Sequence, residues 1–265
     1  MSAAIEFRDL SVAAPQGRLL LDSISLCLEE GTTTAVLGRS GSGKTTLLRT
    51  VNRMVEASSG TVLMFGKSVR DANLISLRRN TGYVIQETGL FPHFTVERNV
   101  GLVLEAQGRP GPQRKRRSHD LLLAVGLDPA SFAHRFPHQL SGGQRQRVGL
   151  ARALAAEPEV LLMDEPFGAL DPLTRREMQE MLRNLLGRLK KTVLLVTHDL
   201  NEALYLGHRI LLLEEGKLVA NLAPEEFLRS RQPEIAAYVR AFHRHDRDAG
   251  AENSHPSSQV PERSE

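Results

Sequence analysis

The residues best suited to chemistry lie in one glycine-rich stretch, Gly38-Arg39-Ser40-Gly41-Ser42-Gly43-Lys44-Thr45, followed by Thr46. It matches the pattern G-x-x-x-x-G-K-[ST], in which backbone N–H groups converge on the phosphates of a nucleotide. The β-rich run Thr33–Leu37 comes before it and a helical pattern, Lys44–Met54, follows, so a helix N-terminus adds its partial positive charge. The stretch therefore predicts a nucleotide site in which Lys44 contacts the β- and γ-phosphates and Thr45 is a ligand of Mg²⁺.

Two adjacent carboxylates, Asp164 and Glu165, come directly after the apolar run Val160–Met163. An acidic residue at the end of a buried strand is the usual second half of a phosphate site. We expect Asp164 to hold Mg²⁺, directly or through water. Glu165 is placed to polarise an attacking water. ATP and Mg²⁺ are thus the expected substrate and cofactor.

A second anion site is indicated by Leu140-Ser141-Gly142-Gly143-Gln144, which opens the helical pattern that carries Arg145–Leu154. A Ser-Gly-Gly helix start offers free N–H groups and the positive end of the helix dipole. One ATP has one γ-phosphate, yet the chain offers two phosphate cradles. We therefore expect two chains to meet head to tail, with each nucleotide between the Gly38–Thr45 loop of one and Ser141–Gln144 of the other.

With these motifs the chain resembles the nucleotide-binding subunits of ATP-binding cassette (ABC) transporters, over about residues 4–243. The resemblance implies that Gln86 contacts the nucleotide and Mg²⁺ and senses a membrane partner. It also implies that Asp171, in the run 168–171, signals across a dimer. His198 resembles the histidine that contacts the γ-phosphate, and we expect it to act in catalysis together with Glu165.

One departure from the family pattern concerns adenine. Family members usually carry an aromatic residue just after the first strand, where it stacks on the base. The corresponding stretch here, Val12-Ala13-Ala14-Pro15-Gln16-Gly17, has none. A stacking contact of ~1 kcal/mol is therefore missing from the predicted ATP site.

Further resemblances concern the type of transporter. The runs Asp164–Pro172 and Gly89–Val96 resemble importer subunits, and Tyr83–His93 with Arg152–Pro158 resembles importers of osmoprotectants such as glycine betaine, carnitine and choline. The apolar loop at 89–96 is either a groove for a permease helix or a buried loop. The implied partners are membrane-spanning permease subunits, a second ATP-binding subunit (another copy of the chain or a different cassette) and, indirectly, a solute-binding protein, at the cytoplasmic face of the inner or plasma membrane. The alternatives are importers of amino acids, sulfonates or nitrate, and a non-transport ABC ATPase.

The elements that must position these residues alternate between strand and helix patterns, which predicts an α/β fold with a mostly parallel sheet. We expect a P-loop NTPase cassette with an N-terminal antiparallel β subdomain and an inserted helical subdomain at about residues 89–155. Helices are expected at Pro172–Leu189 and Leu200–Leu206. Strands are expected at Ile5–Leu10, Ile24–Leu28, Thr33–Leu37, Thr61–Phe65, Tyr83–Ile85, Val160–Met163, Thr192–Val196 and Ile210–Leu213.

Composition sets the remaining limits. The chain has 265 residues, with 34 Lys and Arg against 31 Asp and Glu, and Cys27 is its single cysteine, which is typical of a reducing compartment. The apolar runs are shorter than the ~18 residues that a membrane span needs. The basic run Arg114–Arg117 is interpreted as solvated or facing lipid or a partner, and no nucleic acid is expected. Residues 244–265 form a polar tail that we expect to be disordered.

Overall fold

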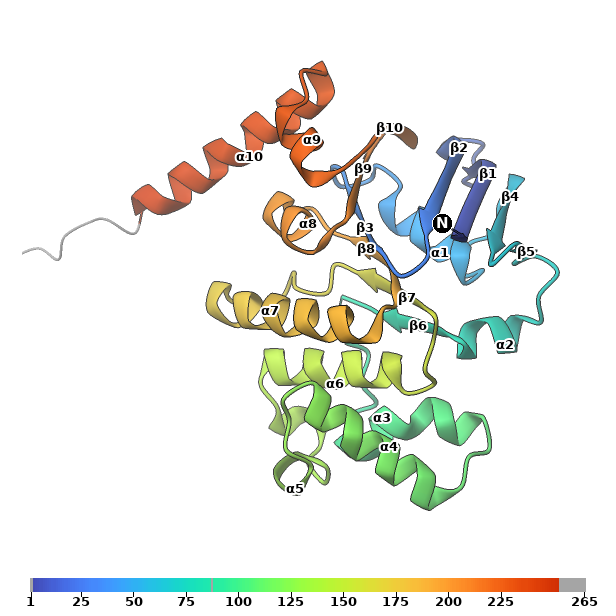
Figure 1. The fold of residues 1–265 in the computed structure, drawn as a ribbon, viewed down its shortest axis with the longest axis vertical. Helices are drawn as coiled ribbons and strands as arrows, with labels where there is room; N and C mark the ends of the chain where they lie inside the picture. Colours follow the sequence, from blue (N-terminus) through green and yellow to red (C-terminus); the bar gives the residue numbers. More distant parts are fainter. Residues whose placement is uncertain (1, 87, 253–265) are drawn as a thin grey trace, which may run out of the picture. The chain divides into compact units, whose positions relative to one another are not determined.

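The computed structural model of the chain describes residues 2–86 and 88–252 (Figure 1). The backbone divides into two compact units, one up to Pro224 and one from Glu225 onward. The first unit contains two sheets and the helices that pack on them. Among the described helices, none combines the length and the apolar composition needed to cross a bilayer.

The central sheet has six strands in the order β10-β9-β3-β8-β7-β6, and only the edge strand β10 runs antiparallel to its neighbour. Every residue of β3, β7 and β8 is buried, as expected of Val- and Leu-rich parallel strands with both faces covered. The predicted mostly parallel sheet is confirmed. Its strands are β3 (Thr33–Leu37), β6 (Thr81–Val84), β7 (Val160–Asp164), β8 (Thr192–Val196), β9 (Arg209–Glu214) and β10 (Lys217–Leu222).

The second sheet is antiparallel, in the order β2-β1-β4-β5, and confirms the expected N-terminal β subdomain. In β2, Ile24, Leu26 and Leu28 are buried and the residues between them are exposed, because successive side chains point to opposite faces. The strands are β1 (Ala3–Ala13), β2 (Leu19–Glu29), β4 (Ser59–Met64) and β5 (Lys67–Ser68).

The chain between β6 and β7 is helical, which confirms the predicted insertion (Figure 1). Thr95 caps the first of these helices and Ser141 the last, each accepting a hydrogen bond from a backbone N–H of the first turn. The elements are α3 (Val96–Ala106), α4 (Gly111–Ala124), α5 (Pro129–Phe132), a 3-10 helix η1 (Pro137–Gln139) and α6 (Gly142–Leu154).

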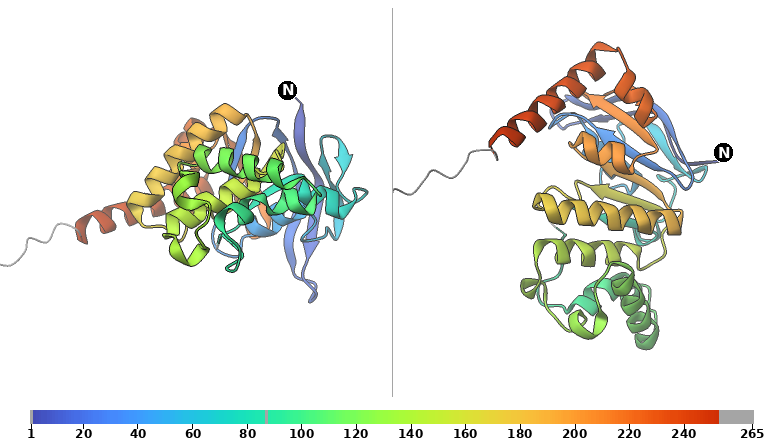
Figure 2. Two further views of the ribbon diagram at one scale, coloured as in Figure 1. Left: turned by 90° about the horizontal axis from the view of Figure 1, so that it is seen from below. Right: turned by 60° about the vertical axis from the view of Figure 1, so that its left-hand side comes forward.

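Two hydrophobic clusters lie on opposite faces of the central sheet. Alternate residues of β7 and β8 belong to different clusters: Leu161 and Leu195 pack with α6 and with α7 (Pro172–Leu189), whereas Leu162 and Leu194 pack with α1 (Lys44–Val51) and the antiparallel sheet. Helices α6 and α7 lie side by side (Figures 1 and 2). The strand ends that carry the predicted site are therefore fixed from both sides.

Three smaller features complete the first unit. Helix α1 ends at Val51 rather than at the predicted Met54, because Arg53 adopts a left-handed backbone conformation (φ 52°) that ends the helix. Helix α8 spans Leu200–Leu206, as predicted, and α2 (Leu74–Arg79) leads into β6.

The second unit contains most of α9 (Pro224–Arg229) and all of α10 (Pro233–Glu252). The predicted disordered tail was to begin at residue 244, but the backbone stays helical to Glu252. Extending an existing helix costs far less than starting one, so polar residues without proline continue it. The rest of the predicted tail, 253–265, lies outside the described residues.

Candidate phosphate-binding site

The loop between β3 and α1 depends on its glycines. Gly38, Gly41 and Gly43 have positive φ angles of 153°, 78° and 101°. A Cβ atom on Gly38 would lie 2.3 Å from the Leu213 carbonyl oxygen, and the loop therefore excludes any side chain there. The hydroxyl of Ser42 is buried and has no hydrogen-bond partner among the described residues. The loop thus forms a tight cradle with a buried polar group still free to bind.

Lys44, the first residue of α1, folds back over this cradle. Its Nζ donates hydrogen bonds to the carbonyl oxygens of Gly38 (2.8 Å) and Arg39 (2.9 Å). Burial lowers the pKa of Lys44, and the charges of Glu165 and Asp164 partly oppose that shift. A cation held by two carbonyl groups inside a glycine loop is well placed to exchange them for phosphate oxygens.

Thr45 and Asp164 meet across the gap between α1 and β7. The Thr45 hydroxyl donates to Asp164 Oδ1 at 2.8 Å, while the Arg49 guanidinium and the Tyr83 hydroxyl lie 3.5 and 3.4 Å from Oδ2. Hydroxyl and carboxylate oxygens side by side suit Mg²⁺, which prefers oxygen ligands, so these residues fit that metal. Sequence reasoning missed Arg49 and Tyr83; the spacing of Arg49, one helical turn after Thr45, was the available signal.

Glu165 and His198 lie together although 33 residues separate them, because β7 and β8 are adjacent parallel strands that end at the same edge. His198 Nδ1 lies 3.2 Å from Glu165 Oε2. A Cβ atom on Gly168 would lie 3.6 Å from Gln86 Nε2 and 3.7 Å from Glu165 Oε2, so the Gln86 amide approaches the same place. The structure therefore gathers Gln86, Glu165 and His198 at the carboxyl edge of the sheet.

The Ser141–Gln144 segment packs against the start of α7. Ser141 and Gln144 form a capping box, in which each side chain accepts a hydrogen bond from the other's backbone N–H at 3.2 and 2.9 Å. A Cβ atom on Gly143 would lie 2.4 Å from Thr174 Cγ2, so the start of α6 presses against α7. Asp171 caps α7 by accepting from Thr174, and these hydrogen bonds hold the pKa of Asp171 below its usual range.

The loop between β6 and α3 is fixed by side chains that sequence reasoning did not identify. Arg152 donates to the carbonyl oxygens of Thr88 and Gly89, both at 2.6 Å, and Gln146 Nε2 donates to the Gln86 carbonyl at 2.9 Å. Asn99, which is fully buried, bonds the backbone of Phe91, Phe94 and Thr95.

The loop fixed by Arg152 and Asn99 exposes an apolar surface to solvent. Phe91 is 42% exposed, and its ring stacks on Phe94 with centroids 5.3 Å apart. The neighbouring Pro92 and His93 are exposed too. Of the two interpretations of this loop, the buried one is wrong.

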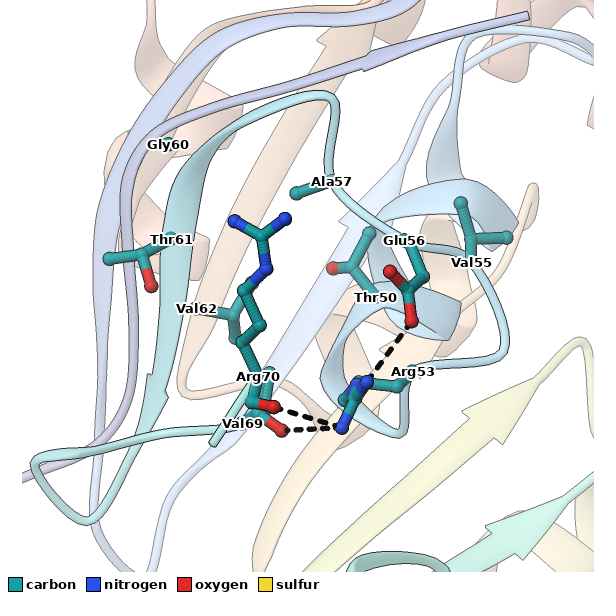
Figure 3. Close-up of a pocket in the computed structure, with 10 residues that line it drawn as sticks. All are labelled: Thr50, Arg53, Val55, Glu56, Ala57, Gly60, Thr61, Val62, Val69 and Arg70. Carbon is teal, nitrogen blue, oxygen red and sulfur yellow. Dashed lines mark hydrogen bonds and ion pairs between the residues drawn. The ribbon is translucent and has the colours of Figure 1, made fainter. Parts of the chain in front are cut away.

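A separate pocket lies between the end of α1 and β4 (Figure 3). The Arg53 guanidinium bonds the carbonyl oxygens of Val69 and Arg70 and the Glu56 carboxylate there. None of the predicted site residues lines this pocket. Arg53 is thus a structural tie between α1 and the antiparallel sheet.

Known proteins with similar sequences are ATP-binding subunits of transporters. The family model described as ABC transporter matches residues 21–168. The chain is 47% identical over 208 residues to "Osmoprotectant import ATP-binding protein OsmV" of Salmonella typhimurium, covering 78% of this chain and 54% of that protein. It is 43% identical over 226 residues to "Glycine betaine/carnitine/choline transport ATP-binding protein OpuCA" of Bacillus subtilis, covering 85% and 59%. The chain thus spans somewhat over half the length of these relatives.

Solved structures resemble the chain over most of its length. The ATP-binding cassette MJ0796, in a dimeric post-hydrolysis state bound to ADP and Pi, is 33% identical, with a TM-score of 0.75 over 83% of this chain and 98% of that one. The protein cbiO1 of Clostridium perfringens, described as part of the ABC transporter complex cbiONQ, is 26% identical, with a TM-score of 0.80 over 91% of this chain and 100% of that one.

Proposed function

Because this chain belongs to the ABC transporter family, we propose that it binds and hydrolyses ATP to drive an importer of quaternary-amine osmoprotectants. The observation that carries the proposal is the meeting of the glycine cradle with Asp164, Glu165 and His198 at one sheet edge. The osmoprotectant class is supported by the names of the relatives at 43% and 47% identity.

Nucleotide binding uses the loop Gly38–Thr46 and Gln86. The backbone N–H groups and Lys44 receive the phosphates, and the buried Ser42 hydroxyl supplies a further donor. Mg²⁺ would be held by Thr45, Asp164 and Gln86. When bound, it would neutralise negative charge on the phosphate oxygens. Burial of the Lys44 ammonium strengthens its attraction for phosphate.

Hydrolysis uses Glu165 and His198. Glu165 accepts a proton from the attacking water, and His198 fixes the Glu165 carboxylate and contacts the γ-phosphate. The water oxygen bonds to the γ-phosphorus as the bond between that phosphorus and the bridging oxygen breaks. ADP and inorganic phosphate leave, and the proton on Glu165 passes to solvent. The backbone of Glu165 is left-handed (φ 47°) and its N–H donates to the Val196 carbonyl, so the chain turns out of β7 at this residue.

The site is completed by a second copy of the chain. Ser141–Gln144 start α6 and pack against α7, so we assign these residues to the nucleotide held by the partner. Asp171 lies beside them and would carry the signal between the two sites. The dimeric MJ0796 cassette, at 33% identity, supports this arrangement.

The exposed loop around Phe91 is the proposed contact with a membrane-spanning permease. The chain would then sit peripherally at the cytoplasmic membrane face, and a solute-binding protein would act on the other side. Closure of the dimer around ATP would move this loop and change access to the solute.

Three measurements test the proposal. Lys44→Ala is expected to abolish tight ATP binding, and an unchanged ATP titration would overturn the nucleotide site.

Glu165→Gln with ATP is expected to elute as a dimer in size-exclusion chromatography, and a monomer alone would contradict the shared site. Uptake of labelled glycine betaine by host cells at high osmolarity, in a strain without other uptake systems, is expected to be lost with Lys44→Ala; unchanged uptake would remove the osmoprotectant assignment.

A further inference from the structure

One buried carboxylate has no part in the hydrolysis described above. Glu202, in the first turn of α8, has a side chain only 5% exposed. The Thr197 hydroxyl donates to its Oε2 at 2.5 Å, and Gln179 Nε2, from α7, donates to Oε1 at 3.3 Å. A buried carboxylate lowers stability unless it is hydrogen-bonded. The bonds that hold Glu202 lie beside the turn that carries His198.

Glu202 fixes the backbone on both sides of His198. The Thr197 hydroxyl that donates to Glu202 also accepts the Asp199 N–H at 3.0 Å. Asp199 Oδ1 in turn accepts the N–H groups of Asn201 (2.8 Å) and Glu202 (3.3 Å). The residues before and after His198 are therefore locked to the start of α8, while His198 itself is exposed.

Arg175 ties this turn to the segment that follows Glu165. Its Nη2 donates to the Leu170 carbonyl at 3.2 Å, its Nη1 lies 3.6 Å from Asp199 Oδ2, and its Nε lies 4.0 Å from Glu202 Oε1. The Nε atom is buried and has no hydrogen bond among the described residues, so the ion pair with Glu202 is its nearest compensation. One guanidinium thus spans the two loops that carry the proposed base and its histidine.

We propose that Glu202 and Arg175 are positioning residues that hold His198 next to Glu165. The proposal rests on the proposed function, because it assumes that His198 and Glu165 carry hydrolysis. Loss of the Glu202 carboxylate frees Thr197 to rotate and leaves Arg175 without its buried partner. His198 then samples positions more than hydrogen-bond distance from Glu165, so the chemical step slows while the phosphate cradle, on β3 and α1, is unchanged.

The test measures kcat, KM and ATP affinity of the whole chain for Glu202→Gln, Thr197→Val and Thr197→Ser. Thr197→Val removes the hydroxyl at nearly constant volume, and Thr197→Ser keeps it. Arg188→Ala is the matched control, since it removes an exposed cation of α7 whose Nε donates to the Asn184 carbonyl of the same helix. Thermal midpoints are recorded for all variants.

We expect Glu202→Gln and Thr197→Val to lower kcat at least tenfold with KM and ATP affinity within about twofold. Thr197→Ser should keep at least half of the original kcat, and Arg188→Ala should match the unaltered chain. Equal kcat values for Thr197→Val and Thr197→Ser would overturn the proposal, as would parallel changes in kcat and KM. Glu165→Gln and His198→Ala are run beside them: if these keep full activity, the proposed function fails, whereas if they are inactive and Glu202→Gln is not, only the positioning role fails.

Discussion

Replacing Asn99 by leucine should release the loop that we propose as the permease contact. Asn99 is fully buried, and its Oδ1 accepts the Phe91 N–H at 2.8 Å. Its Nδ2 carries two hydrogens shared among the carbonyl oxygens of Phe91, Phe94 and Thr95, at 3.0–3.1 Å. About three hydrogen bonds are therefore lost in Asn99→Leu, while leucine, with the same number and branching of side-chain heavy atoms, leaves no cavity.

The expected cost follows from that count. A net ~1 kcal/mol for each hydrogen bond gives about 3 kcal/mol of lost unfolding free energy. For a chain of this size that corresponds to a drop of roughly 6–12 °C in the thermal midpoint. Asn99→Asp should be worse at neutral pH, because it keeps the Phe91 contact but sets a negative charge against three carbonyl oxygens.

Denaturant unfolding and a local probe check the two parts of this reasoning. The chain contains no tryptophan, so Phe91→Trp supplies a single fluorescent reporter on the loop. In that background Asn99→Leu should increase quenching by iodide, and Asn184→Leu, at an exposed position of α7, should change neither signal. A loss below 1 kcal/mol with unchanged quenching would show that Asn99 does not hold the loop.

Three further predictions concern Glu202, Gly143 and Arg152. Burial raises the pKa of Glu202 above its ordinary value of 4.5. The stability of the unaltered chain relative to Glu202→Gln should therefore be highest below pH 4.5 and should fall as the pH rises to the raised pKa. Urea unfolding of both proteins from pH 4 to 8 measures this difference, and a constant difference would refute the prediction. Gly143→Ala should destabilise the fold by about 1–3 kcal/mol through its clash with Thr174, and Thr174→Ser, which removes the methyl group, should restore most of the loss. Arg152→Met should raise amide hydrogen exchange at residues 88–91 more than Arg152→Lys does, and equal exchange in the two variants would refute the clamp on Thr88.

The sequence was most informative where burial leaves little choice. The bounds predicted for Thr33–Leu37 and Thr192–Val196 agree with β3 and β8, because both are short runs of β-branched and aliphatic residues with every side chain buried. The strand Lys217–Leu222 and the helices after it were not predicted. Its mixed sequence carries no clear alternation, and pairing with β9 decides its conformation.

Among the site residues, those in a sequence motif were predicted, and those that bind the backbone of a distant loop were not. Lys44 and Asp164 are recognisable because phosphate and metal chemistry fixes their type and spacing. Gln146, Arg152 and Asn99 act on carbonyl oxygens of a distant loop. Any residue presents a carbonyl oxygen, so the acceptor side of such a contact leaves no trace in the sequence.

These backbone contacts give α6 a specific mechanical role. The helix has 13 residues and, at 1.5 Å per residue, is about 20 Å long. Gly142 lies in its first turn, Gln146 in its second turn binds the Gln86 carbonyl, and Arg152 in its last turn binds the Thr88 and Gly89 carbonyls. A force on the start of α6 would therefore reach the loop after β6 through this single helix. The start of α6 is proposed to meet a partner's phosphate, and the loop bound by α6 is proposed to meet a permease. We therefore expect the two to move together, because both are attached to the same helix.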